Sequence, residues 1–123
     1  EKVHLLGLRN DVRDLMAEAD VLVHTSAAET CTYAISESMA AGIPAVVTEA
    51  GAAREQIEDG VSGYVVGRDD ESAFTRRMAE LAGDPDRRRL MGQAARQRWE
   101  TRYRVENAAR KYHELYRSLA ALS

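Results

Sequence analysis

Short apolar runs alternate with helical patterns through the first half of this chain. We expect strands at residues 3–6, 20–24, 45–48 and 63–66. Residues 11–19, after Asn10 as the N-cap, and residues 32–41, before Gly42 and Pro44, have the apolar spacing of helices. Strands that are apolar throughout and joined by helices are typical of a parallel sheet covered on both faces. The sequence therefore predicts an α/β fold with a doubly wound, Rossmann-like parallel sheet.

The second half of the chain predicts helices alone. Helical patterns occupy residues 70–82, 85–100 and 105–122, and Asp84 with Pro85 marks the start of the middle one. We therefore treat residues 1–123 as one domain, with strand–helix units at 1–68 and three helices at 69–123.

Charge is distributed unevenly between these two parts. Residues 1–75 contain 5 Lys and Arg against 14 Asp and Glu, whereas residues 76–123 contain 12 against 6. A basic surface can make the chain a non-catalytic module that binds nucleic acid or an acidic partner. Arginine is also a good helix former with a solvated head group, and acidic residues interrupt this basic run. Both interpretations stay open, and we favour solvated helices.

Composition excludes several classes of protein. A single cysteine, Cys31, excludes an internal disulfide and a cysteine-rich zinc site. No apolar run approaches the roughly 20 residues that cross a bilayer, and no basic and apolar leader opens the chain. We expect a cytoplasmic protein, whose full-length form can associate peripherally with the inner face of the membrane.

Two carboxylates lie near the carboxyl end of the second expected strand, where parallel sheets bind ligands. Glu29 falls in the loop, and Glu37 falls about a turn and a half into the next helix. Because Glu37 lies among small and apolar residues, we expect it to be poorly solvated and to need hydrogen-bond donors. The loops that follow the other strands, at residues 7–10, 48–54 and 66–69, are expected at the same edge.

This combination suits a ligand that carries both hydroxyls and an anionic group. The two carboxylates can accept hydrogen bonds from hydroxyls, and the amides of Thr32 and Tyr33 at the helix N-terminus can bind an anion. A nucleotide sugar is one such ligand. The alternative is that Glu29 helps to cap the helix while Glu37 points to water.

Six stretches, in order, resemble one enzyme family. Glu29 and Glu37 match an E-x7-E motif, and similar segments lie at residues 5–12, 19–26, 39–46, 59–66 and 84–96. Together they resemble the C-terminal half of family 4 glycosyltransferases, which are retaining enzymes of GT-B fold that use nucleotide-sugar donors. The resemblance covers essentially the whole chain, and its strength lies in the order of the motifs.

The resemblance implies where the sugar and the ribose of the donor bind. Glu29, Thr30 and Cys31 would contact the donor sugar, and Glu37 would bind the ribose hydroxyls. In such enzymes the acceptor attacks from the face that the diphosphate leaves, so Glu29 would position the sugar and would not act as a general base. The family often has a small or aromatic pair such as Gly-Phe where this chain has Thr30 and Cys31, so the contacts to the donor sugar would differ here.

The resemblance also implies contacts to the rest of the donor. The backbone amides of Thr32 and Tyr33 would contact the diphosphate, and the backbone at Leu8 and Arg9 would border the base. No cofactor and no essential metal are expected, since the substrate itself is the nucleotide-diphosphate sugar.

A complete domain of this family begins with two further βα units, the first of which supplies an Arg and a Lys to the diphosphate. Neither unit is recognisable in this sequence, and the strand expected at residues 3–6 would lack its two neighbours. We therefore expect a partial donor-binding domain that is inactive alone, with an N-terminal GT-B domain and these units as its missing partners.

Overall fold

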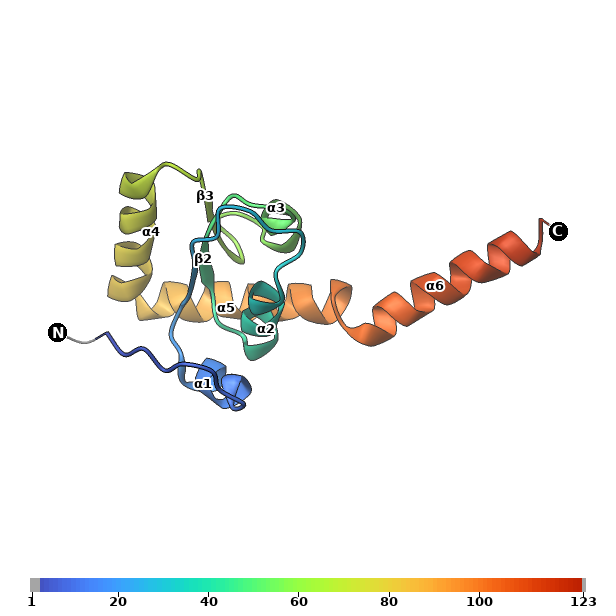
Figure 1. The fold of residues 1–123 in the computed structure, drawn as a ribbon, viewed down its shortest axis with the longest axis horizontal. Helices are drawn as coiled ribbons and strands as arrows, with labels where there is room; N and C mark the ends of the chain where they lie inside the picture. Colours follow the sequence, from blue (N-terminus) through green and yellow to red (C-terminus); the bar gives the residue numbers. More distant parts are fainter. Residues whose placement is uncertain (1–2, 123) are drawn as a thin grey trace.

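A computed structural model describes residues 3–122, in which three parallel strands form a small sheet between helices (Figure 1). The strands are β1 (Leu22–His24), β2 (Ala45–Thr48) and β3 (Gly63–Val66), in the order β1-β2-β3. Val46 of β2 lies opposite Val23 on one side and Tyr64 on the other. The expected parallel α/β arrangement is therefore present.

Six helices connect or follow the strands in the described part of the chain. They are α1 (Val12–Glu18), α2 (Tyr33–Ala41), α3 (Ala53–Gln56), α4 (Glu71–Gly83), α5 (Pro85–Arg102) and α6 (Val105–Ala120). As predicted, α2 ends at Gly42, which has a φ of 75°, and the Asp84 side chain caps α5. The N-cap of α1 is Asp11 and not Asn10, and the short helix α3 was not predicted.

The core lies on both faces of β2, all four of whose residues are buried. Ala45 and Val47 pack with Ile35 and Met39 of α2, whereas Val46 packs on the opposite face with Leu81 of α4. Helix α5 contributes to both clusters. Coverage of both faces is the doubly wound arrangement that the unbroken apolar strands predicted.

Helices α2 and α5 approach each other closely at a pair of glycines. A Cβ atom on Gly92 of α5 would lie 2.1 Å from the carbonyl oxygen of Gly42, so only glycine fits there. This contact fixes α5 against the end of α2, and it brings the C-terminal half of α5 to the side of α2 where candidate site residues lie.

The prediction of a strand at residues 3–6 is wrong. Residues 3–10 have no regular structure, and Leu5 and Leu8 are about fully exposed, at 98% and 101%. Within the described residues β1 is an edge strand, so no neighbour pairs with the backbone of this segment. Apolar composition favours a strand only where a partner strand accepts its hydrogen bonds.

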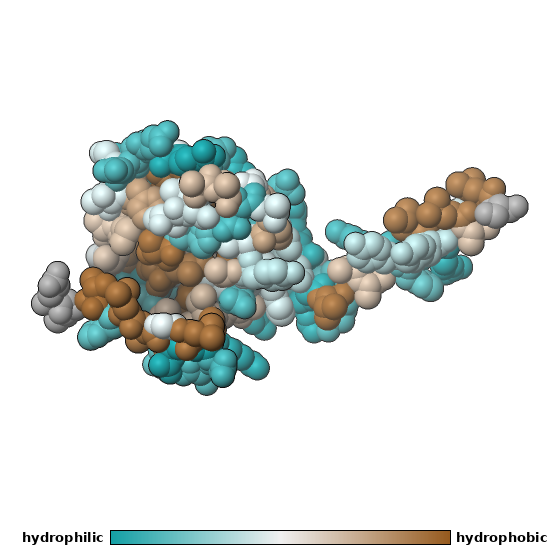
Figure 2. All heavy atoms as spheres, viewed as in Figure 1, coloured by the Kyte–Doolittle hydropathy of each residue, from teal (hydrophilic) through white to brown (hydrophobic). Residues whose placement is uncertain are grey.

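Helix α6 projects from the rest of the structure (Figure 1) and buries none of its residues. Its apolar face is formed by Val105, Tyr112, Leu115, Tyr116 and Leu119, and Figure 2 shows hydrophobic residues toward its far end. The broad apolar face expected at 105–122 therefore exists, but it covers no other element in residues 3–122. No helix among the described residues has the length and hydropathy to cross a membrane.

Candidate functional site

The loop from β1 to α2 begins at the carboxyl end of a strand and ends at the start of a helix. Thr48, at the carboxyl end of β2, donates a hydrogen bond through Oγ1 to the Ser26 carbonyl oxygen at 2.7 Å. This bond ties the loop to the end of the neighbouring parallel strand. Residues 25–32 therefore lie beyond the carboxyl edge of the sheet, as the sequence predicted.

Glu29 lies beside His24, the last residue of β1. Its Oε1 atom is 3.6 Å from Nε2 of His24, and the two side chains are 30% and 21% exposed respectively. The strand end thus places an imidazole next to the carboxylate, with a part of each side chain open to solvent. The carboxylate of Glu29 can accept hydrogen bonds from ligand hydroxyls on its exposed side.

The start of α2 is only partly available to a ligand. Thr32 is buried, and its amide donates to Oε1 of Gln56 at 3.2 Å. That amide is therefore already paired, which removes the hydrogen bond that we expected it to offer to a diphosphate. Tyr33 is exposed at 85% and its amide lies in the first turn of α2, where no intrahelical acceptor exists.

Thr30 and Cys31 lie between Glu29 and the helix, and both are exposed. The carbonyl oxygen of Thr30 accepts a hydrogen bond from the Ala52 amide at 2.9 Å. Cys31 is a free thiol. Both side chains are therefore accessible from the carboxyl edge of the sheet while the backbone beneath them is held.

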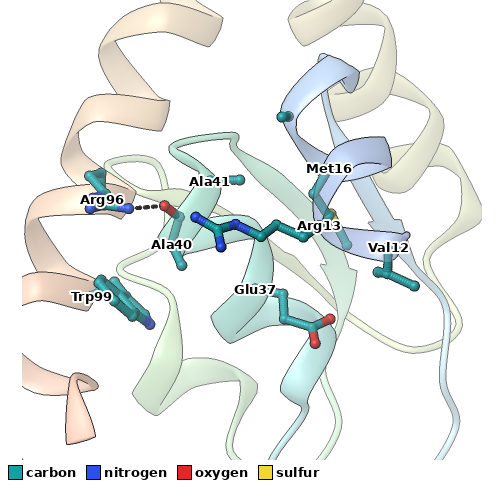
Figure 3. Close-up of a pocket in the computed structure, with 9 residues that line it drawn as sticks. Val12, Arg13, Met16, Glu37, Ala40, Ala41, Arg96 and Trp99 are labelled. Atoms are coloured by element: carbon teal, nitrogen blue, oxygen red, sulfur yellow. Dashed lines mark hydrogen bonds between the residues drawn. The ribbon is translucent and has the colours of Figure 1, made fainter. Parts of the chain in front are cut away.

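Glu37 lines a hollow of about 610 Å³ between α1, α2 and α5 (Figure 3). Arg13 extends across it from α1 toward Ala40 and Ala41, and Trp99 of α5 lies on the far side. The expectation that Glu37 is poorly solvated is wrong, because its side chain is exposed, and the buried residues of α2 are Ile35, Ser38 and Met39. Glu29 is not among the residues that line this hollow.

One cation of α5 closes the hollow from the side opposite Arg13. The Arg96 guanidinium donates to the Ala40 carbonyl oxygen and to Glu100, at 2.8 Å for the latter, and lies 4.9 Å from the Trp99 ring. No pattern in the sequence pointed to Arg13, Arg96 or Trp99, because a linear pattern does not indicate that α1 and α5 pack along α2. The Gly92 position is the one local signal, since glycine inside a helix often marks a close approach.

Leu8 and Arg9 belong to the exposed segment before α1. Arg9 donates from Nε to Asp11 at 2.7 Å, and this pair raises the pKa of Arg9 and lowers the pKa of Asp11. Within the described residues, Leu8 and Arg9 share no cavity with Glu29. Their expected place beside a base stays a prediction.

A second hollow, of about 580 Å³, opens along the carboxyl edge of the sheet. Its lining comes from the ends of all three strands and from the start of α4, and includes Thr25, Thr48, Arg68, Asp70 and Phe74. Three of the four loops that we expected at this edge therefore meet there. Among residues 3–122 no group of three or more His, Cys, Asp and Glu side chains could hold a metal ion.

A parallel sheet covered by helices on both faces, with a hollow at its carboxyl edge, defines the class: part of a doubly wound α/β domain. The family model for glycosyl transferases group 1 matches residues 1–98, and the chain belongs to this family. Its fold is that of GT-B glycosyltransferases, as the resemblance implied.

Individual relatives agree with this assignment. The chain is 28% identical over 116 residues to N-acetyl-alpha-D-glucosaminyl L-malate synthase of Bacillus anthracis. This match covers 94% of this chain and 30% of the relative. It is 36% identical over 104 residues to a D-inositol 3-phosphate glycosyltransferase of Corynebacterium urealyticum, covering 85% of this chain and 24% of that one. The chain spans about a quarter to a third of the length of these curated relatives.

A solved structure shows the same fold with a nucleotide sugar bound. Anabaena Alr3699/HepE in complex with UDP-glucose superposes with a TM-score of 0.83 at 29% identity, over 92% of this chain and 31% of that one. Its complex with UDP superposes with a TM-score of 0.86.

Proposed function

We propose that this chain forms part of the donor-binding domain of a retaining glycosyltransferase, which transfers a sugar from a nucleotide-diphosphate sugar to an acceptor. The observation that carries the proposal is the path of the β1–α2 loop. It leaves the carboxyl end of a parallel strand, presents Glu29, and enters α2 at Tyr33, an exposed residue whose amide lies in the first turn. Such a loop places a carboxylate that can accept hydrogen bonds from sugar hydroxyls beside a backbone amide that can donate a hydrogen bond to an anion.

Within this proposal each part of the donor has a partner. Glu29, with Thr30 and Cys31, binds the sugar hydroxyls, and the Tyr33 amide binds the diphosphate. Glu37 binds the ribose from the rim of the hollow between α1 and α2. Because the Thr32 amide already donates to Gln56, we assign it no contact with the phosphate. Its role is instead to hold the neighbouring Tyr33 amide in place.

The segment of Leu8 and Arg9 borders the base in this proposal. It leads directly into α1, which lines the hollow that holds Glu37. The remaining contacts to the diphosphate, and those to the acceptor, come from parts of the protein outside this chain.

The competing interpretation was a basic module for nucleic acid or an acidic partner. Many of the basic side chains in α4 and α5 are paired within the chain: Arg77 and Arg87 with Glu80, Arg89 with Asp86, Arg96 with Glu100, and Arg98 with Glu58. These ion pairs offset a part of the basic charge of α4 and α5, and the family match gives the chain an enzyme context, so we favour the glycosyltransferase proposal over this function.

A thermal-shift panel of UDP-, GDP- and ADP-sugars on the full-length protein tests the proposal. A ligand that binds only the native state raises its stability by mass action, by about 2.7 kcal/mol at a hundredfold excess over Kd. We expect one nucleotide class to raise the Tm, and this effect to persist at high salt. No shift with any nucleotide sugar, together with salt-sensitive binding of nucleic acid, would reject the proposal in favour of the basic module.

A further inference from the structure

Gln56 is a polar side chain that is 1% exposed, and no motif drew attention to it. It ends the short helix α3, yet its amide group makes all its recorded hydrogen bonds with residues 20 or more positions earlier. Oε1 accepts from the Thr32 amide at 3.2 Å, and Nε2 donates to the Thr32 carbonyl oxygen at 3.0 Å and to Oγ of Ser36 at 3.1 Å.

This side chain takes the place of a strand neighbour for Thr32. Thr32 has extended backbone angles, with φ −89° and ψ 115°, and its own hydroxyl makes no capping hydrogen bond to α2. Gln56 pairs with both the donor and the acceptor of that backbone, as an adjacent strand would. The position at which α2 begins is therefore set by Gln56.

The residues before Gln56 hold the preceding part of the loop. The Ala52 amide donates to the Thr30 carbonyl oxygen at 2.9 Å, and a Cβ atom on Gly51 would lie 2.3 Å from the Glu29 carbonyl oxygen. Gly51, Ala52 and Gln56 thus contact the backbone of residues 29, 30 and 32, and we call these contacts the loop clasp.

Helix α5 supports the loop clasp through hydrogen bonds to the backbone of α3. Arg98, whose side chain is 15% exposed, donates to the carbonyl oxygens of Gln56 at 2.8 Å and Glu55 at 2.9 Å. Tyr103 donates to the same Glu55 oxygen at 2.7 Å. The backbone that carries Gln56 is therefore fixed, so its side chain has little freedom to follow a displaced loop.

We propose that Gln56 is a positioning residue for donor binding, which fixes Thr32 and thereby the direction of the Tyr33 amide that receives the diphosphate. The inference rests on the proposed function. Gln56 itself touches no ligand in this account, because it lies beneath the backbone of Thr32. Its loss moves the amide, and a displacement of about 1 Å at a positioned group can reduce activity on the order of a hundredfold.

Three variants of the full-length protein test this role. Gln56→Leu removes every hydrogen bond of the side chain, Gln56→Glu keeps the acceptor for the Thr32 amide but removes the donor, and Ser36→Ala removes one bond at little risk to folding. Ser62→Ala is the matched control: Ser62 is 2% exposed and accepts from the Glu58 amide at 2.9 Å, in the turn before β3.

The probes are UDP and uridine, or the matching pair for the nucleotide that the donor panel selects. We expect Gln56→Leu and Gln56→Glu to weaken UDP binding about tenfold or more and uridine binding less than threefold, with Ser36→Ala intermediate for UDP. We expect Ser62→Ala to lower Tm while changing the affinities for UDP and uridine by the same factor. A general loss of stability would move both ligands together.

The outcomes separate the inference from the proposed function. If wild-type protein binds UDP and the Gln56 variants retain its affinity, or lose UDP and uridine equally, the positioning role is wrong and the proposed function stands. If wild-type protein binds no nucleoside diphosphate of the panel, the proposed function fails and the inference fails with it.

Discussion

Replacing Gly51 by alanine tests whether the loop clasp controls the candidate site. Gly51 has a φ of 51°, and an added Cβ atom would lie 2.3 Å from the Glu29 carbonyl oxygen and 2.6 Å from that of Thr30. Contacts below 3.0 Å are essentially never seen for real Cβ atoms, so the Glu29 backbone must move by about 0.7 Å or more.

A second glycine provides the matched control. Gly60 has a φ of 77°, and nothing lies within 4 Å of a Cβ atom built there. Both substitutions place an L-residue in the left-handed region, which costs roughly 1–2 kcal/mol. Gly51→Ala adds an overpacking cost of about 1–3 kcal/mol, and the difference between the two variants isolates that added cost.

Urea unfolding and donor turnover are measured for both variants in the full-length protein. We expect Gly60→Ala to lose about 1–2 kcal/mol of unfolding free energy with turnover unchanged. Gly51→Ala should lose more stability and, because Glu29 is displaced, on the order of a hundredfold in turnover. Equal stability and equal turnover in the two variants would show that residues 51 and 29 are not in contact as described.

Three further predictions concern single side chains. Glu37→Ala should mainly weaken nucleotide binding, whereas Glu29→Ala should cut turnover of bound donor; equal affinities and rates in both variants refute these roles. Arg77 holds the pKa of Glu80 below its usual range, so the stability from ionised Glu80 is present at neutral pH and lost as pH falls through that lowered pKa. Glu80→Gln should therefore cost about 0.5–1 kcal/mol of unfolding free energy at pH 7 and less at acidic pH, and an equal cost at both would contradict this. Alkylation of the exposed Cys31 should slow when a nucleotide sugar is bound, and an unchanged rate places the sugar elsewhere.

The sequence predicted those parts of the fold that local patterns determine. The buried strands β2 and β3 and the helix end at Gly42 follow from apolar runs and from glycine, which act over a few residues. The strand at residues 3–6 was wrong, because a strand also depends on a neighbour that the described residues do not supply.

The position of the candidate loop could be predicted from the sequence, but the contacts that hold the loop in place could not. Glu29 and Tyr33 lie at the carboxyl edge of the sheet, where the alternation of strands and helices predicted this loop. The exposure of Glu37, the paired Thr32 amide and the role of Gln56 depend on contacts between distant segments. A glutamine in a turn-rich stretch carries no signal of the backbone that it will meet.

The most direct measurement is a titration of the full-length, ¹⁵N-labelled protein with the nucleoside diphosphate that the panel selects, followed by amide chemical shifts. We expect the largest shifts at residues 29–34, led by Tyr33, with smaller ones near Glu37. Shifts confined to α5 and α6, with the amides of 29–34 unmoved, would contradict the claim that this loop holds the diphosphate of a sugar donor.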